Sequence, residues 1–369
     1  MTGMIILRDL FHRSIASSFA LNRESKVTTM EPTLSTPQSG LTTEQQQQIT
    51  AAAQILCAGG TVAFPTETVY GLGADVTNPS AIHKIYRIKQ RPADHPLIVH
   101  IGAIAHLQYW SQAIPESAWK LAQHFWPGPL TFILQRNRRI PDCVTGGQDT
   151  VGLRMPAHPI ALALLQALGP EKALAAPSAN RFGRISPTTA AHVQQELGPE
   201  VDMILDGGAC AVGLESTIIS FHDDLPQILR PGGIALSALE TVLEGPVLLP
   251  HNGQQTIRTS GSLPAHYAPA TPLRIYPAEQ LWQRAVALAE QDLRILVITW
   301  SHRAQSRPAL SQSIEQFAMP SDPVAYGQQL YARLRQFDRA AFDYLLVEAP
   351  PDHPGWLAVT DRLQRASYH

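Results

Sequence analysis

The sequence predicts an α/β protein, and three observations support this class. Short apolar runs with the pattern of buried strands alternate with helical segments over most of the chain. The helical segments repeat their apolar residues at spacings of three and four. The chain has 369 residues, of which 44% are hydrophobic, and this length exceeds one average domain. We therefore expect two α/β domains.

The first predicted domain covers residues 41–247. A helix is expected in TTEQQQQITAAAQILC, because threonines that can cap a helix precede good helix formers and a glycine pair follows. The apolar run 61–64 predicts a buried strand, and NPSAIHKIYRIKQRP predicts a helix that ends near Pro92. Further strands are predicted in PLIVHI, TFIL, TVGLRMP, KALAAPSAN and STIISF, and further helices in ALALLQALG and TTAAHVQQELG.

A change of composition marks the second domain. Residues 248–272 are predicted to form a linker, since HNGQQTIRTSGSLPAHYAPATP is rich in glycine, serine and proline. Residues 273–369 then contain the strand PLRIYP, the helix EQLWQRAVALAEQ, the strand RILVITW, the helix VAYGQQLYARLRQF and the strand DYLLVEAP. This βαβαβ unit can bury a core of its own, so we predict a small α/β domain.

Residues 1–40 stand apart from both domains. Their arginines and serines resemble a transit peptide, but Asp9 and Glu24 count against a targeting signal. We expect a disordered extension, or one that precedes a true start at Met30.

Composition excludes several classes of protein. A formal net charge of −2 and a charged fraction of 16% give no overall attraction to nucleic acid or to an anionic membrane. The three cysteines are far apart in the sequence, which argues against a disulfide framework and favours a reducing, cytoplasmic location. No apolar run reaches the length of about 18 residues that a membrane helix needs.

The common nucleotide and hydrolase motifs are absent from the sequence. GLGA at 71–74 lacks the third glycine of a dinucleotide fingerprint, and LDGGACAVGLEST lacks the Gly-Lys-Ser/Thr of a P-loop. HExxH and GxSxG do not occur, which removes the usual zinc-protease and serine-hydrolase interpretations.

Polar residues instead cluster where predicted strands end. Thr150 and Arg154 lie four apart, so both face the same side of a strand, and His95 and His100 lie on either side of another. Taken singly, such residues are more often caps, turns or surface groups. Together they place arginines and hydroxyls at the carboxyl ends of strands, where open α/β sheets bind ligands. The other members of these clusters are Lys84, Arg87, Lys89, Arg91, Ser178, Asn180, Ser186, Ser216 and Arg230.

Seven of these segments, in order, resemble the YrdC-type domain of L-threonylcarbamoyl-AMP synthases: FPTETVYGLG, KQRP…HPLIVH, FWPGPLT, TVGLRMP, APSAN, GLESTI and ILRPG. The HYAP linker and the small α/β tail resemble the longer, two-domain branch of that family. The resemblance covers residues 41–369. It implies a twisted, open, mixed sheet around a cationic concavity, followed by a small Rossmann-like domain.

The resemblance also implies a reaction. ATP, L-threonine and bicarbonate would give L-threonylcarbamoyladenylate and pyrophosphate. A separate transferase would then use the product to make N6-threonylcarbamoyladenosine next to the anticodon of tRNA. The residue types agree with this chemistry, because a carbamate is already anionic and needs no strong general base. The site must supply positioning and positive charge along the polyphosphate, with Mg²⁺ accompanying ATP.

Site residues follow from the motif positions that the resemblance supplies. Arg91 and Lys89 are the expected catalytic cations, and Thr66 is a neighbour whose role we cannot separate from that of Thr68. His95 stands where the family has asparagine, and its charge near pH 6.5 would make ATP binding pH-dependent. The tail segment GWLAVTDRLQRA lacks glycine and asparagine residues typical of the family's end, so we assign it no role. The resemblance implies that Thr68, His100, Arg154, Ala176 and Ser216 bind L-threonine, and that Arg91, His95, Thr150, Ser178, Ser186, Arg230 and Tyr267 bind ATP.

Three further interpretations concern the linker and two alternatives. Residues 251–272 are predicted to form a lid over the site, with Tyr267 closing on ATP. An RNA-binding module, with weak tRNA binding, is a first alternative, disfavoured by the neutral charge and by the lack of interleaved aromatic and basic residues. A carbamoyl-transfer maturation factor of hydrogenases is a second, disfavoured because CxxC pairs and an acylphosphatase module are missing from the sequence.

Overall fold

The computed structural model describes residues 40–222, 225–249, 257–261, 266–302 and 312–368. Residues 40–369 form one compact unit. The predicted N-terminal extension lies, except for Gly40, outside the described residues. Within them, none of the helices is long and apolar enough to cross a membrane.

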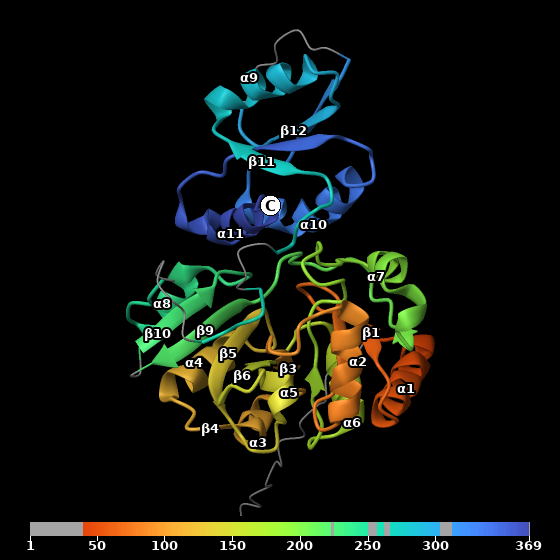
Figure 1. Cartoon of the computed structure of the whole chain (residues 1–369). Coiled ribbons are helices and arrows are strands. Elements are labelled where there is room, and N and C mark those ends of the chain that lie inside the picture. Colours follow the sequence, from red (N-terminus) through yellow and green to blue (C-terminus); the bar gives the residue numbers. More distant parts are fainter. Residues whose placement is uncertain (1–39, 223–224, 250–256, 262–265, 303–311, 369) are drawn as a thin grey trace, which may run out of the picture. The chain divides into compact units, whose positions relative to one another are not determined.

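The larger sheet has ten strands in the order β10-β9-β5-β6-β3-β7-β2-β1-β8, with β4 paired to β5 (Figure 1). Parallel pairs (β3–β6, β5–β9 and β1–β8) occur beside antiparallel ones, so the predicted mixed sheet is confirmed. The strands are β1 (Val62–Phe64), β2 (Gly71–Asp75), β3 (Ile98–His100), β4 (Ser111–Gln112), β5 (Leu130–Arg136), β6 (Thr150–Arg154), β7 (Leu174–Ala175), β8 (Met203–Ile204), β9 (Thr217–His222) and β10 (Leu225–Arg230).

The predicted helices of this domain are confirmed, and their ends have identifiable caps. Thr42 and Gln45 form a capping box at the first helix. Asn78 caps the second, which ends at Gln90 in a left-handed conformation with φ 53°. The helices are α1 (Thr43–Cys57), α2 (Pro79–Lys89), α3 (Leu107–Trp110), α4 (Glu116–Phe125), α5 (Asp142–Thr145), α6 (Pro159–Leu168), α7 (Ala190–Glu196) and α8 (Leu236–Leu243), with short 3₁₀ turns at Ile104–His106 and Gly198–Glu200.

The small C-terminal domain contains a four-stranded parallel sheet in the order β11-β14-β12-β13. Its third strand in chain order, β13, and its last helix, α11, were not among the predicted elements. Along β12, Ile295 and Val297 pack with α9 on one face, and Leu296 and Ile298 pack with α10 and α11 on the other (Figure 1). The elements are β11 (Leu273–Tyr276), α9 (Ala278–Ala289), β12 (Ile295–Thr299), β13 (Ile314–Ala318), α10 (Pro323–Phe337), β14 (Tyr344–Glu348), a 3₁₀ turn (Pro354–Trp356) and α11 (Leu357–Ala366).

The core beneath α10 and α11 is shared between the two domains. The cluster that contains Tyr331 and Leu363 also contains Val69, Leu214 and Tyr267, which belong to the larger domain and the linker. The small domain therefore buries one cluster internally and completes a second one against loops of the larger domain.

Candidate functional site

A cavity of about 530 Å³, including its open mouth, lies where several strands of the larger sheet end. His100 and Arg154 are the last residues of β3 and β6 and are register partners in this parallel pair, so both reach the same edge. Ala176 follows β7 directly, Ser216 precedes β9, and Arg230 ends β10. The cavity is lined by Thr66, Thr68, Val69, Gly71, Arg91, Ile98, His100, Arg154, Ala176, Pro177, Ser178, Glu215, Ser216, Arg230, Ser260, Gly261, His266 and Tyr267.

Most of the predicted site residues are brought together in this cavity. All five residues expected to bind threonine line it: Thr68, His100, Arg154, Ala176 and Ser216. From the set expected to bind ATP, Arg91, Ser178, Arg230 and Tyr267 also line it. Because these residues span the sequence from 68 to 267, only the fold can bring them to one place.

Lys89 is not among the lining residues, and its surroundings differ from those expected of a catalytic cation. The side chain is buried, and Nζ donates to the backbone carbonyls of Ser178, at 2.6 Å, and of Asn180. Burial, and then the neighbouring Arg91, hold the pKa of Lys89 well below its ordinary value. Lys89 therefore fixes the APSAN backbone and reaches the cavity only through Ser178.

Three more predicted residues lie outside the cavity lining. Thr150 lines a separate small hollow beside the linker. Ser186 is fully buried, and its hydroxyl donates a hydrogen bond to the Glu215 carboxylate. His95 packs edge-on against Phe182, with ring centroids 5.2 Å apart. Burial lowers the pKa of His95, with Arg91 adding to the shift, so the ring is expected to titrate below its ordinary pKa of about 6.5. A half-buried imidazole beside a guanidinium resists a second positive charge.

Besides Arg154, which pairs with Glu67, two buried guanidinium groups give the cavity positive charge. Arg91 donates from Nη2 to the Pro96 carbonyl at 3.0 Å, and Arg230 donates from Nη1 to the Ser260 carbonyl at 2.8 Å. Among the described residues, no carboxylate lies within ion-pair distance of either group. Burial lowers the pKa of Arg91 to about 10, which still leaves it charged at neutral pH. Both arginines can therefore pair with an anionic ligand.

Four buried nitrogen atoms of lining residues have no hydrogen-bond partner within the described part of the chain. They are Nε of Arg91, Nδ1 of His100, Nε of Arg230 and Nδ1 of His266. Buried polar groups left without a partner carry a desolvation cost, so such atoms in a native protein need an explanation. Their convergence on one cavity indicates that it receives a polar ligand.

Two carboxylates that the sequence did not single out belong to the site. Glu67 Oε1 accepts from Arg154 Nη2 at 2.7 Å, and its Oε2 accepts from the Ala157 amide at 3.0 Å. Glu215 lines the cavity itself. Glu67 lies in the FPTETVYGLG motif and Glu215 in the GLESTI motif, so the motifs could have drawn attention to both carboxylates. The motifs do not indicate which residues pair with them.

The described part of the linker covers the cavity. Ser260, Gly261, His266 and Tyr267 all line it. Tyr267 is buried with φ 61°, and Gly261 has φ 78°. A Cβ on Gly261 would lie 2.1 Å from the Tyr267 hydroxyl oxygen, so only glycine permits this approach. Residues 251–256 and 262–265 of the predicted lid lie outside the described residues.

Comparisons with known proteins agree with this geometry. A family described as "Telomere recombination" (Sua5_yciO_yrdC) matches residues 54–232, and one described as "Threonylcarbamoyl-AMP synthase, C-terminal domain" matches residues 234–367. The threonylcarbamoyl-AMP synthase of Pyrococcus abyssi is 37% identical over 88% of this chain and 95% of its own length. That of Bacillus subtilis is 40% identical over 87% and 93%.

A solved structure shares the fold over most of the chain. The crystal structure of P. abyssi Sua5 complexed with L-threonine superposes with a TM-score of 0.79 at 36% identity, and covers 87% of this chain and 94% of its own. The chain belongs to the threonylcarbamoyl-AMP synthase family of enzymes, in its two-domain form.

Proposed function

We propose that this chain condenses L-threonine, bicarbonate and ATP into L-threonylcarbamoyladenylate and pyrophosphate. The observation that carries the proposal is the single cavity in which the residues expected to bind threonine and most of those expected to bind ATP converge. Family membership gives the reaction class, and the relative with bound L-threonine supports the amino-acid substrate.

The cavity suits a reaction between two anions. The threonine amine attacks bicarbonate and a water is lost, which gives a carbamate. A carbamate oxygen then attacks the α-phosphorus of ATP while pyrophosphate leaves. In this proposal Arg154, which lines the cavity together with Thr68 and His100, binds the amino-acid carboxylate. Arg91 and Arg230, which line it as well, stabilise the negative charge of the polyphosphate.

His100 contributes as a neutral ring. Burial, and then the charge of Arg154, lower its pKa to about 3, so the imidazole is uncharged at neutral pH. Its Nδ1 has no partner among the described residues and is free to hydrogen-bond a substrate. Because the ring is neutral, it does not form an ion pair with the threonine carboxylate, which is left to Arg154.

Mg²⁺ enters this proposal with ATP, as part of the substrate. Among the described residues, no group of three or more His, Cys, Asp or Glu side chains is arranged to hold a metal ion. Mg²⁺ in nucleotide enzymes is commonly held by substrate phosphates and waters with few protein ligands. We therefore expect the phosphate oxygens to supply most of its coordination.

The product is a mixed anhydride that water hydrolyses, so it must be shielded and passed on. We propose that the described linker residues Ser260, Gly261, His266 and Tyr267 shield it from water. We also propose that a separate transferase uses it to modify tRNA next to the anticodon, in the cytoplasm. Ser260 and Tyr267 at the cavity wall support the lid.

Mass spectrometry tests the proposed function. The full chain is incubated with ATP, L-threonine, bicarbonate and Mg²⁺, and each component is left out in turn. We expect a threonylcarbamoyladenylate peak and pyrophosphate only in the complete mixture. Threonine-independent release of pyrophosphate, without the adenylate, would contradict the proposal.

A further inference from the structure

Glu215 is a buried carboxylate in the wall of a cavity proposed to bind two anions. The proposed reaction assigns this carboxylate no role. The residue is 7% exposed. Its Oε2 accepts from Arg362 Nε at 2.7 Å and from the Tyr331 hydroxyl at 2.9 Å. Its Oε1 accepts from the Ser186 hydroxyl at 2.7 Å. These contacts occupy both carboxylate oxygens.

Two of these three donors come from the small domain. Tyr331 lies on α10 and Arg362 on α11, 147 residues after Glu215 in the sequence. Arg362 has no exposed surface, and its Nη2 also donates to the Pro231 carbonyl at 3.1 Å. Its guanidinium lies 5.2 Å from the centre of the Tyr267 ring. One arginine of the small domain therefore contacts two residues of the cavity wall, Glu215 and Tyr267.

The charge of Glu215 makes this arginine necessary. Burial alone would raise the pKa of Glu215, but Arg362 and Arg230 lower it to about 2, so the carboxylate is ionised. Burial would likewise lower the pKa of Arg362, but Tyr267, Glu215 and Asp361 raise it above its ordinary value. An ionised carboxylate in this wall, if it lacked Arg362, would repel a polyphosphate and would bind Arg230 in its place.

We propose that Arg362 is a positioning residue that the small domain supplies to the cavity: it neutralises Glu215 and supports the Tyr267 ring, and so keeps Arg230 available for ATP. This inference rests on the proposed function in one respect, namely that ATP is the ligand. It assigns a role to the tail segment GWLAVTDRLQRA, to which the sequence analysis assigned none.

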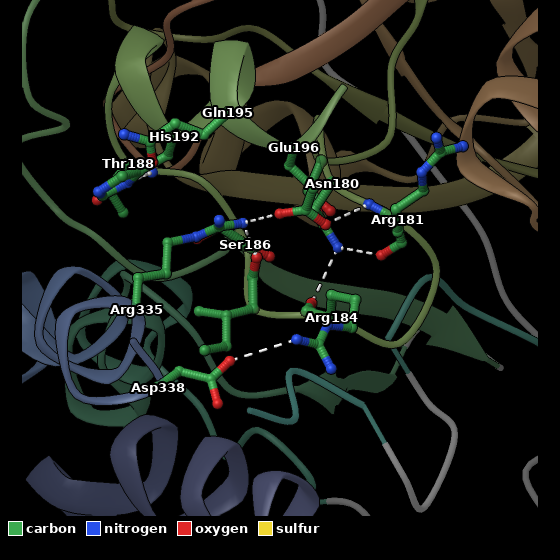
Figure 2. A network of polar contacts seen from close by, with 12 residues as sticks. Asn180, Arg181, Arg184, Ser186, Thr188, His192, Gln195, Glu196, Arg335 and Asp338 are labelled. Atoms are coloured by element: carbon green, nitrogen blue, oxygen red, sulfur yellow. Dashed lines mark hydrogen bonds and ion pairs between the residues drawn. The ribbon is translucent and has the colours of Figure 1, made fainter. Parts of the chain in front are cut away.

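A second arginine of the small domain contacts Ser186, the residue whose hydroxyl donates to Glu215. Figure 2 shows Arg335 of α10 between Glu196 and Ser186; Nε donates to the Ser186 carbonyl at 3.4 Å, and Nη2 donates to the Glu196 carboxylate at 2.5 Å. Ser186 is thus held at its backbone by Arg335 and at its hydroxyl by Glu215. Arg335 of the small domain and Glu215 of the cavity wall therefore both hold Ser186.

A double-mutant cycle in the full chain tests the proposal. The variants are Arg362→Met, Glu215→Gln and the double variant, and the readouts are the Kd of MgATP by titration calorimetry and the KM and kcat for ATP. Arg362→Met should raise the Kd and KM for ATP by about thirtyfold or more, the usual effect of leaving one buried charge unpaired, with a smaller change in kcat. The double variant should bind ATP within about threefold of the wild type, because residue 215 is then uncharged and Asp361, which also pairs with Arg362, keeps its ion pair with Arg365.

The controls separate this role from a structural one. Arg294→Met removes an arginine of the same domain that pairs with the exposed Glu315, and it should leave ATP affinity unchanged. Arg362→Lys keeps the charge and loses the planar contact with Tyr267, so it should fold and bind ATP better than Arg362→Met. Circular dichroism melts show that each variant is folded at the assay temperature.

The two failures are distinguishable. If the double variant binds ATP as weakly as Arg362→Met, or if folded Arg362→Met binds ATP as well as the wild type, the inference is wrong. If the wild type binds ATP but forms no adenylate from threonine, the proposed function fails, while the calorimetric cycle still decides the role of Arg362.

Discussion

Replacing Arg154 by lysine tests whether this side chain binds the carboxylate of threonine. The substitution keeps the positive charge and loses the planar pair of N–H donors. In the structure Nη2 of Arg154 already donates to Glu67 at 2.7 Å, and Nε approaches the Gly128 carbonyl at 3.4 Å. A lysine ammonium in this place would pair with Glu67 and would leave the substrate carboxylate with fewer donors.

The expected magnitude follows from the lost hydrogen bond. One hydrogen bond to a charged group contributes about 1.5–3 kcal/mol, which corresponds to about a tenfold to hundredfold change in affinity. We therefore expect the Kd of L-threonine to rise by that factor and the Kd of ATP to change by less than about threefold.

Calorimetric titration of each ligand into the variant measures both constants. Arg136→Lys is the matched control, because Arg136 is a partly buried arginine of the same sheet that pairs with Asp142 and does not line the cavity. An equal loss of affinity for threonine and ATP in Arg154→Lys, or a loss for ATP alone, would refute the assignment.

Four further predictions test other parts of the account. L-Serine should be a poorer substrate than L-threonine by the contribution of one methyl group, about 1–3 kcal/mol, and L-valine should be rejected more strongly than L-serine. Equal rates with L-serine and L-valine would show that the hydroxyl is not recognised. His95→Asn should retain activity and match the wild-type pH profile between about pH 6.5 and 7.5, since the lowered pKa of His95 moves its titration to more acidic pH; an inactive variant would show that the imidazole is needed. Burial lowers the pKa of His100 and of His266 to about 3. Their contribution to the free energy of unfolding is therefore complete above the unfolded-state pKa near 6.5 and is lost as pH falls towards 3. A melting temperature that does not fall over this pH range would contradict these pKa values. Gly261→Ala should raise the KM for ATP, because the new Cβ would displace Tyr267, and an unchanged KM would argue against the lid.

The shared core changes the interpretation of a truncation experiment. If the small domain were independent of the larger one, removing residues 273–369 would only slacken the linker. Val69, Leu214 and Tyr267 pack in one cluster with residues of α10 and α11, so this truncation would also expose apolar surface beside the cavity. Point substitutions at the interface, such as Arg362→Lys, separate the two effects.

The sequence predicted the parts of the site that depend on local pattern. His100, Arg154 and Ser216 were expected at strand ends, and parallel or adjacent strands bring such ends together. The direction of a side chain is harder to predict. The sequence shows Lys89 only as one more cation near the end of a helix. In the structure its ammonium is directed to buried backbone carbonyls, because the APSAN loop passes over that end of α2.

Long-range pairs could not be read from one sequence. Glu215 and Arg362 are 147 residues apart, and neither motif indicates the other. The strand β13 (IEQFA) was missed because a half-buried edge strand with polar residues gives a weak apolar pattern. The helix α11 was missed because its buried face includes a charged residue, Arg362.

The central claim is that one cavity binds L-threonine and ATP and joins them through a carbamate. Bicarbonate labelled with ¹³C tests it directly, with mass spectrometry of the adenylate formed by the full chain from ATP, L-threonine and Mg²⁺. The account predicts a threonylcarbamoyladenylate peak that shifts by one mass unit with the labelled bicarbonate and that disappears when threonine is omitted. An adenylate without the label, or pyrophosphate release with no adenylate containing threonine, would contradict it.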